Sequence, residues 1–231
     1  WTLPMPTSKL PRYAIIVAGG KGLRMGSALP KQFLPLAGRP VLMHTLECFA
    51  RVVDEVILVL PEDHITYWEG LCQKYDFTLP IRLALGGETR FHSVLSALRL
   101  LPKAGWVAVH DGVRPLVSQE LIEACFVQAE AVGAALPALP MTDSLRQLDE
   151  TGSSHAVERS QFVGVQTPQT FSLERLHTAY LQPYQPTFTD DASIYEASGF
   201  GAPALVPGER TNIKITTPLD LSLAELLLTQ A

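Results

Sequence analysis

The residues best suited to chemistry lie in one glycine-rich segment, residues 17–36, which reads VAGGKGLRMGSALPKQFLPL. It holds four glycines and the cationic side chains of Lys21, Arg24 and Lys31, and it has no acidic residue. Glycines let backbone N–H groups approach phosphate oxygens, because no Cβ stands in the way. Lysine and arginine add positive charge over the same anion, and Pro30 restricts the chain just before Lys31. The segment therefore indicates a phosphate-binding site, with a tight turn and solvated cations as the alternative.

The spacing within this segment excludes one common phosphate-binding motif and disfavours another. No G-x-x-x-x-G-K-[ST] fits there, so the segment is not a P-loop. Gly20-Lys21-Gly22 begins like a dinucleotide fingerprint, but Met25 occupies the place of the third glycine. A charged stretch with a proline then follows instead of a long helix. A nicotinamide-dependent dehydrogenase is therefore a poor interpretation.

A second candidate is Asp111 in the motif HDGVRP, which follows an apolar run predicted to be a strand. Ligands of parallel α/β sheets bind beyond the carboxyl ends of the strands, which is where Asp111 would lie. A carboxylate beside phosphates would be repelled unless a cation came between them, so we expect Mg²⁺ at Asp111. The alternative is an aspartate that only caps a β-turn.

The motif GGETRFHSV places Gly86 and Gly87 before a helix that we expect to open with Glu88. Such glycines allow the backbone to approach a flat base closely, and the first N–H groups of a helix have no intrahelical partner. The alternative is an ordinary helix start at which Ser93 is merely exposed.

The motif RTNIKITTPLDL places Lys214 in an alternating strand before a helix that starts near Pro218. A lysine on a strand is usually a solvated edge residue. Its side chain alone gives no reason to assign it a function.

The charge of the chain is unevenly distributed. The formal net charge is −5, yet residues 1–53 carry seven Lys and Arg against one Glu, a net of +6, and residues 54–231 carry eleven against twenty-two acids, a net of −11. A local positive field in an acidic protein suits a small polyanion better than a nucleic acid.

Other sequence signals bear on the compartment. Cys48, Cys72 and Cys125 are odd in number and widely spaced, so we expect reduced thiols rather than disulfides or a zinc site. The first residues lack the apolar region of a signal peptide, and no apolar run approaches a membrane span. We expect a cytoplasmic protein that does not enter a membrane.

Short apolar runs alternate with helical patterns along the chain. The predicted strands are 13–17, 55–60, 81–85, 106–110 and 133–139, and the predicted helices are 41–51, 62–75, 90–101, 119–132, 173–181, 191–198 and 219–228. Apolar residues make up 47% of the chain, enough for a sizeable core. The alternation predicts one α/β domain over 1–231, with a mostly parallel, twisted, Rossmann-like sheet and helices on both faces.

One polar segment, Met141 to Ser160, interrupts this alternation. Two short alternating stretches flank the turn-like DETG, so the segment predicts a projecting β-hairpin. A polar hairpin of this length is marginally stable alone, which favours a partner surface over a solvated excursion. We take 140–162 as the bounds of this β-arm.

Seven motifs in order make the chain resemble a known family. They are AIIVAGGKGLRMGSALPKQFLPLAGRPVLMHTLECF, GGETRFHSVLSAL, VAVHDGVRP, PMTDSLR, VERSQFVGVQTPQTF, TDDASIYEASG and GERTNIKITTPLDLSLAE. The first is similar to the signature of the glycosyltransferase-A-like nucleotidyltransferases. Its LPKQFLPL variant is most similar to the 2-C-methyl-D-erythritol 4-phosphate cytidylyltransferases of the non-mevalonate isoprenoid pathway. The resemblance implies transfer of the cytidylyl group of CTP to that polyol phosphate, with Mg²⁺ as cofactor.

The resemblance also implies roles for individual residues. Nucleotide-binding positions would be Ala18, Gly19, Gly20, Gly22, Gly87, Glu88, Ser93, Asp111 and Gly112, with the metal at Asp111. Catalytic positions would be Arg24, Lys31, Arg159 and Lys214. Positions that bind the acceptor would be Arg114, Ser144, Thr167 and Thr189. Glu88 stands where the family often has Asp, and Ser144 replaces a threonine, which keeps the hydroxyl and loses a methyl contact.

The β-arm would cross to a second subunit in such a protein, forming a homodimer in which Ser144 and Arg159 enter the partner's acceptor site. His110 is not expected to act as a base, because the acceptor phosphate is already an anion near neutral pH. Two rival functions are transfer to a pentitol phosphate such as ribitol 5-phosphate, and a catalytically silent nucleotide-binding module. The presence of Arg24, Lys31, Asp111 and Lys214 together disfavours the silent module.

Overall fold

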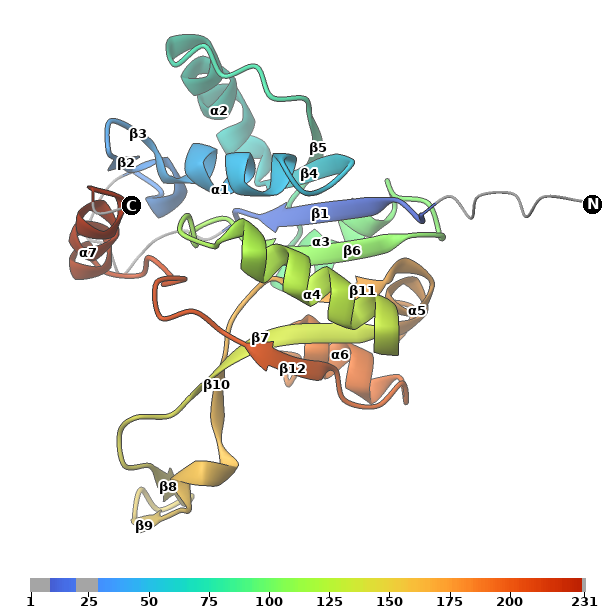
Figure 1. Cartoon of the computed structure of the whole chain (residues 1–231), viewed down its shortest axis with the longest axis vertical. Coiled ribbons are helices and arrows are strands. Elements are labelled where there is room, and N and C mark those ends of the chain that lie inside the picture. Colours follow the sequence, from blue (N-terminus) through green and yellow to red (C-terminus); the bar gives the residue numbers. More distant parts are fainter. Residues whose placement is uncertain (1–8, 20–28, 230–231) are drawn as a thin grey trace, which may run out of the picture.

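The computed structural model describes residues 9–19 and 29–229, and its centre is a mixed β-sheet (Figure 1). Within these residues the sheet has eight strands in the order β10-β7-β11-β6-β1-β4-β5, with β12 beside β7. Their bounds are β1 Arg12–Val17, β4 Glu55–Leu60, β5 Ile81–Leu85, β6 Trp106–Asp111, β7 Ala134–Pro140, β10 Val163–Val165, β11 Gln169–Ser172 and β12 Ala204–Pro207.

One half of the sheet is parallel and the other half is mixed. Strands β6, β1, β4 and β5 run parallel, whereas β11 is antiparallel to β6 and β7, and β10 is antiparallel to β7. The predicted fold class, α/β with a mostly parallel sheet, is confirmed. All five predicted strands exist. The pattern analysis missed β10, β11 and β12, because three or four residues are too few to establish a period.

Helices cover both faces of the sheet, and successive residues of β1 show why. Ala14 and Ile16 face a cluster with α1, α2 and α4, whereas Ile15 faces a cluster with α3, α5 and α6. Strands buried on both faces must be apolar throughout, which explains the continuous runs in the sequence. The helices are α1 Val41–Ala50, α2 Glu62–Lys74, α3 Arg90–Leu98, α4 Gln119–Val132, α5 Leu173–Ala179, α6 Asp191–Ala197 and α7 Pro218–Thr229. No helix in the described ranges is long and apolar enough to cross a membrane.

The β-arm projects from the sheet at the end of β7 (Figure 1). Strands β8 (Arg146–Leu148) and β9 (Ser154–Ala156) pair in antiparallel fashion, as the hairpin prediction requires. The Asp149 N–H donates to the Ser153 carbonyl, and the Asp149 carboxylate accepts from the backbone of Thr151 and Ser153. These bonds fix the turn that DETG predicts.

The prediction of a strand around Lys214 is wrong. Residues 212–216 belong to no helix or strand, although the Ile215 N–H donates to the Val113 carbonyl at 2.9 Å. Ile215 is fully buried in a small cluster with Leu36, Val41 and Ala224. The alternating pattern therefore reflects an irregular segment that packs Ile215 into a small core, rather than a strand paired along a sheet edge.

Candidate active site

A cavity of about 280 Å³ lies where β1 and β6 end, and we call it the β1–β6 cavity. Its lining comes from five separate parts of the chain: Val17, Ala18, Gly19, Lys31, Gln32, Gly87, Glu88, Thr89, Arg90, Ser93, Asp111, Val113 and Lys214. The carboxyl ends of adjacent parallel strands meet at one edge of the sheet, which is why residues far apart in sequence share this space.

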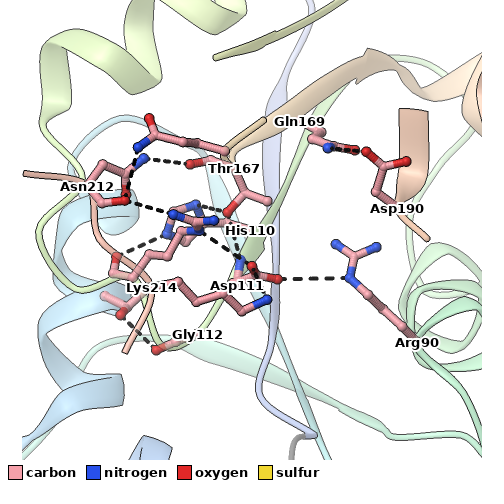
Figure 2. Close-up of polar contacts among 12 residues, drawn as sticks. Arg90, His110, Asp111, Gly112, Thr167, Gln169, Asp190, Asn212 and Lys214 are labelled. Carbon is pink, nitrogen blue, oxygen red and sulfur yellow. Dashed lines mark hydrogen bonds and ion pairs between the residues drawn. The ribbon is translucent and has the colours of Figure 1, made fainter. Parts of the chain in front are cut away.

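Asp111, the last residue of β6, lies among three cationic side chains (Figure 2). Its Oδ2 atom is 2.9 Å from Lys214 Nζ and 3.5 Å from Arg114 Nε, and its Oδ1 atom is 3.9 Å from Arg90 Nε. Burial alone would raise the pKa of Asp111, but the positive charges of Arg90, Lys214 and Arg114 outweigh burial and hold that pKa well below its usual range. Asp111 is therefore ionised throughout the neutral range.

A chain of hydrogen bonds fixes the backbone beside Asp111. The Asp111 N–H donates to Thr167 Oγ1 at 3.1 Å, Thr167 Oγ1 lies 2.9 Å from His110 Nδ1, and His110 Nε2 lies 3.1 Å from the Arg114 carbonyl oxygen. A carbonyl only accepts, so Nε2 carries the proton and Nδ1 accepts from the Thr167 hydroxyl. Burial is the main cause that lowers the pKa of His110 to about 4. The neutral imidazole thus supports the turn.

Lys214 reaches the cavity because the preceding segment is tied down by polar side chains (Figure 2). Gln166 Nε2 donates to the carbonyls of Glu209 and Asn212, and the Glu209 N–H donates back to Gln166 Oε1. The buried side chain of Asn212 donates to the Thr167 carbonyl at 2.9 Å, and Arg114 Nη1 donates to the Asn212 carbonyl at 2.8 Å. These side-chain bonds take the place of the strand-to-strand hydrogen bonds that the predicted strand at Lys214 would have made.

Lys31 opens the short 3₁₀ helix η2 (Lys31–Phe33), which also includes a buried glutamine. Gln32 Nε2 donates to the Ala18 carbonyl at 2.8 Å, and Phe33 packs into the core. The two residues after Lys31 therefore anchor η2 to the end of β1, and Lys31 lines the cavity. The sequence analysis missed Gln32, although an amide in an apolar run is a signal for such an anchor.

The glycine pair before α3 forms the opposite wall. The Gly87 N–H donates to Ser93 Oγ at 3.0 Å, and a Cβ added at Gly87 would lie 2.4 Å from the Cβ of His92. Glycine is thus required by close packing against the helix. Thr89 caps α3, which begins at Arg90 as the predicted helix 90–101 does, and Glu88 is exposed before it.

Arg90 is a functional candidate that the sequence analysis missed. It lines the cavity and pairs with Asp191, Nη1 to Oδ2 at 2.7 Å, in addition to facing Asp111. The partner Asp191 lies far away in sequence at the start of α6. No local spacing reveals such a pair.

Several expected site residues lie outside the cavity lining. Gly112 is packed against β1 and α1, since a Cβ there would be 3.1 Å from Ala18 Cβ and Leu42 Cδ1. Arg114 and Thr167 lie directly behind Asp111 and bond to it or to its neighbours. Thr189 is exposed just before α6.

Five further expected residues lie either on the β-arm or outside the described residues. Ser144 and Arg159 are exposed on the β-arm, and the Arg159 guanidinium donates to the Thr142 carbonyl. Gly20, Gly22 and Arg24 lie outside the described residues. The cavity therefore brings together Ala18, Gly19, Lys31, Gly87, Glu88, Ser93, Asp111 and Lys214 from the expected set.

The donor set of the cavity limits which metal it could hold. Over the described ranges there is no group of three or more His, Cys, Asp or Glu side chains able to hold a metal ion, and the cavity is lined by two acids, Asp111 and Glu88. Zinc-type sites need more protein ligands than this. Mg²⁺ is usually bound by one or two carboxylates together with substrate phosphates, so the residues fit Mg²⁺ in the presence of a nucleotide.

A cationic cavity at the carboxyl ends of parallel strands, around one ionised carboxylate, is suited to enzymes that transfer phosphate groups. The chain is an enzyme of the nucleotidyltransferase class. The sequence model of the 2-C-methyl-D-erythritol 4-phosphate cytidylyltransferase (IspD) family matches residues 13–230. The chain therefore belongs to this family, which confirms the resemblance seen in its motifs.

Relatives and solved structures agree with this assignment. A 2-C-methyl-D-erythritol 4-phosphate cytidylyltransferase of Porphyromonas gingivalis is 60% identical over 222 residues, 96% of this chain and 99% of the relative. The 2-C-methyl-D-erythritol 4-phosphate cytidylyltransferase of Bacteroides fragilis is 52% identical over 94% of this chain and 99% of that relative. The crystal structure of the Thermus thermophilus cytidylyltransferase has a TM-score of 0.76 at 34% identity, over 94% of this chain and 98% of that one. The crystal structure of the Anaerococcus prevotii 4-diphosphocytidyl-2C-methyl-D-erythritol synthase has a TM-score of 0.79 at 30% identity, over 94% of this chain and 96% of that one.

Proposed function

We propose that the β1–β6 cavity transfers the cytidylyl group of CTP to 2-C-methyl-D-erythritol 4-phosphate, giving 4-diphosphocytidyl-2-C-methyl-D-erythritol and diphosphate. One observation supports this most directly: Lys31 and Lys214, from distant parts of the chain, line one cavity with the ionised carboxylate of Asp111. Both substrates are polyanions and repel each other, so an enclosure of positive charge is the main requirement for bringing them together.

The nucleotide would lie between the end of β1 and the start of α3. Among the described residues, no atom lies within 4 Å of a Cβ added at Gly19, so its backbone can approach a phosphate. Gly87, Glu88 and Ser93 form the opposite wall, where a flat base would fit. Gly20, Gly22 and Arg24 would continue the phosphate-binding segment.

The metal of this reaction would be Mg²⁺ held at Asp111. When bound, it would neutralise charge on the phosphate oxygens of CTP. Asp111 suits this task because it stays ionised and its backbone is fixed by Thr167. The remaining ligands would be phosphate oxygens and water.

The chemical step would need positioning more than acid–base catalysis. An oxygen of the acceptor phosphate attacks the α-phosphorus of CTP in line, the new P–O bond forms, and the bond to the departing diphosphate breaks. Lys31, with Arg24, would stabilise the charge that develops on the α-phosphate and the diphosphate. Lys214 would hold the attacking phosphate, and Arg114, Thr167 and Thr189 would complete the acceptor side.

The β-arm would supply the rest of the acceptor site in a homodimer. Leu148, Phe162, Val163 and Val165 are large apolar residues of the arm and its base, and all are exposed in the single chain. Burial against a second copy would stabilise them. The partner's Ser144 and the partner's Arg159 would then contact the acceptor, and each chain would form one domain over 1–231 with residues 140–162 as its arm. The working compartment would be the cytoplasm, with neither nucleic acid nor membrane as a partner.

A panel that measures diphosphate release tests this function. It crosses four nucleoside triphosphates with 2-C-methyl-D-erythritol 4-phosphate and ribitol 5-phosphate, each with Mg²⁺ and with a chelator. We expect the fastest release with CTP, the methylerythritol phosphate and Mg²⁺. Faster release with ribitol 5-phosphate would move the assignment to the pentitol enzyme, and no release from any pair would favour the silent nucleotide-binding module.

A further inference from the structure

Arg90, the first residue of α3, lies between two carboxylates that belong to different elements. Its Nη1 atom is 2.7 Å from Asp191 Oδ2 on α6, and its Nε atom is 3.9 Å from Asp111 Oδ1 at the end of β6. Figure 2 shows Arg90 and Lys214 approaching Asp111 from different sides. Arg90 thus faces one carboxylate oxygen while Lys214 and Arg114 face the other.

The carboxylate behind Arg90 is fully buried and is itself held. Asp191 has no exposed surface, and the buried Tyr180 donates its hydroxyl to Asp191 Oδ1 at 2.6 Å. Phe91, the next residue of α3, stacks on the Tyr180 ring at 4.7 Å between centroids. A buried carboxylate is costly without a paired cation and a hydrogen bond, so this arrangement holds the Arg90 guanidinium at a fixed place.

Arg90 and Lys214, two of the three cations at Asp111, therefore differ in freedom. The side chain of Lys214 is 42% exposed and ends in a compact ammonium on a flexible stem, so it can turn from Asp111 to an arriving phosphate. The side chain of Arg90 is 29% exposed and its planar guanidinium is anchored by Asp191. Arg90 can remain beside Asp111 when Lys214 moves.

We propose that Arg90 is a positioning residue that fixes the Asp111 carboxylate during the reaction, and that Asp191 and Tyr180 hold Arg90 for this purpose. The proposal rests on the proposed function, because it concerns the same carboxylate. Arg90 acts through Asp111, so its loss should slow the chemical step more than it weakens the binding of either substrate.

The test compares kcat and both KM values for Arg90→Met, Arg90→Lys, Asp191→Asn and Tyr180→Phe. Arg90→Met should lower kcat by about 100-fold. Arg90→Lys should have a kcat about tenfold higher than Arg90→Met, because lysine restores the positive charge but not the planar, two-pronged donor geometry of the guanidinium. Asp191→Asn should lower kcat by about tenfold and Tyr180→Phe by less, with KM for CTP and acceptor within about threefold of wild type. Asp191→Asn and Arg90→Lys keep the test decisive if Arg90→Met does not fold.

A matched control separates positioning from general loss of stability. Glu130→Gln weakens another arginine pair, Arg12 with Glu130, at the far end of β1, and it should lower stability without changing kcat. The proposal is overturned if kcat in the Arg90 and Asp191 variants stays within about twofold of wild type, or if lysine gives no rescue. It is also overturned if KM for CTP rises while kcat is unchanged, since Arg90 would then bind the nucleotide directly.

A separate readout keeps this proposal distinguishable from the function itself. The Arg90 Nη1–H groups, which face Asp191, should give a protected ¹⁵N NMR signal in the wild-type enzyme, and Asp191→Asn should abolish that protection while Glu130→Gln should not. If the wild-type enzyme releases no diphosphate in the panel above, the proposed function fails whatever this signal shows. If it is active and the signal is equally protected in Asp191→Asn, the anchoring of Arg90 is wrong.

Discussion

Lys214 Nζ lies 2.9 Å from Asp111 Oδ2, although the two residues come from distant parts of the chain. The contact joins the end of β6 to a segment that belongs to no helix or strand. In the absence of substrate, the lysine neutralises the carboxylate. When an acceptor phosphate and a metal ion bind as we propose, the same ammonium would be within reach of a new anion. The pair would therefore be a resting arrangement of the charges that the proposed reaction needs.

Replacing Lys214 should affect the acceptor more than the nucleotide. Lys214→Met keeps the length of the stem and removes the charge, so we expect KM for the acceptor to rise and kcat to fall by about 10²-fold or more. Steady-state diphosphate release measures both. Lys103→Met, which removes an exposed lysine that does not line the cavity, is the control and should match wild type. A normal acceptor KM with a raised CTP KM would contradict this role.

Replacing Asp111 should weaken both the fold and the enzyme. Asp111→Asn leaves Lys214 and Arg114 without a counter-charge, whereas Arg90 keeps Asp191. We expect the free energy of unfolding to fall by about 1–3 kcal/mol, as measured by urea denaturation. Diphosphate release should be lost at all Mg²⁺ concentrations. Full activity restored by more Mg²⁺ alone would show that Asp111 contributes only affinity for the ion.

His110 predicts a particular dependence of stability on pH. Its pKa in the folded protein, about 4, is below the ordinary value of 6.5, so its stabilisation is complete above pH 6.5 and is lost as the pH falls toward 4. The loss should total on the order of 3 kcal/mol. His110→Gln should remove this part of the slope of unfolding free energy against pH, whereas His155→Gln on the exposed β9 should keep it. Equal slopes in the wild type and His110→Gln would contradict the assignment.

The homodimer hypothesis makes a complementation test possible. Arg159→Ala should raise KM for the acceptor and leave CTP binding nearly unchanged, because the partner's Arg159 would contact only the acceptor. At an acceptor concentration well below KM, Arg159→Ala and Lys31→Ala chains, each impaired alone, should regain activity when mixed, since one mixed site would have both residues intact. Activity that stays at the level of the separate variants would place Arg159 in its own chain's site or outside any site.

Sequence reasoning reached the strands and the chemistry of single positions, but it missed relationships between distant residues. The apolar runs of β1, β4 and β6 predicted a doubly covered sheet, because strands buried on both faces must be apolar. The motif around Asp111 predicted its place at a strand end. Arg90 was missed because its partner Asp191 is set by how α3 and α6 pack, and this packing leaves no local pattern.

The strand wrongly predicted at Lys214 also reflects contacts between distant residues that leave no local pattern. Alternation reports which side chains are buried, and Ile215 is buried, but it does not report whether the backbone has a neighbouring strand. Here Gln166 and Asn212 supply the hydrogen bonds instead. Which side chains bond to a backbone segment is set by the tertiary structure, so a local sequence pattern does not reveal it.

The most direct measurement is the single-turnover rate constant of cytidylyl transfer in Lys31→Ala, Lys214→Met and the double variant, each shown to be folded. The account predicts that each single change slows transfer by at least about 100-fold, a loss of roughly 2.7 kcal/mol in stabilisation of the transition state. The double change should cost less than the product of the two, because both cations act on one transition state. A folded single variant that transfers within a few-fold of wild type would contradict the claim that these two charges converge on the reacting phosphates.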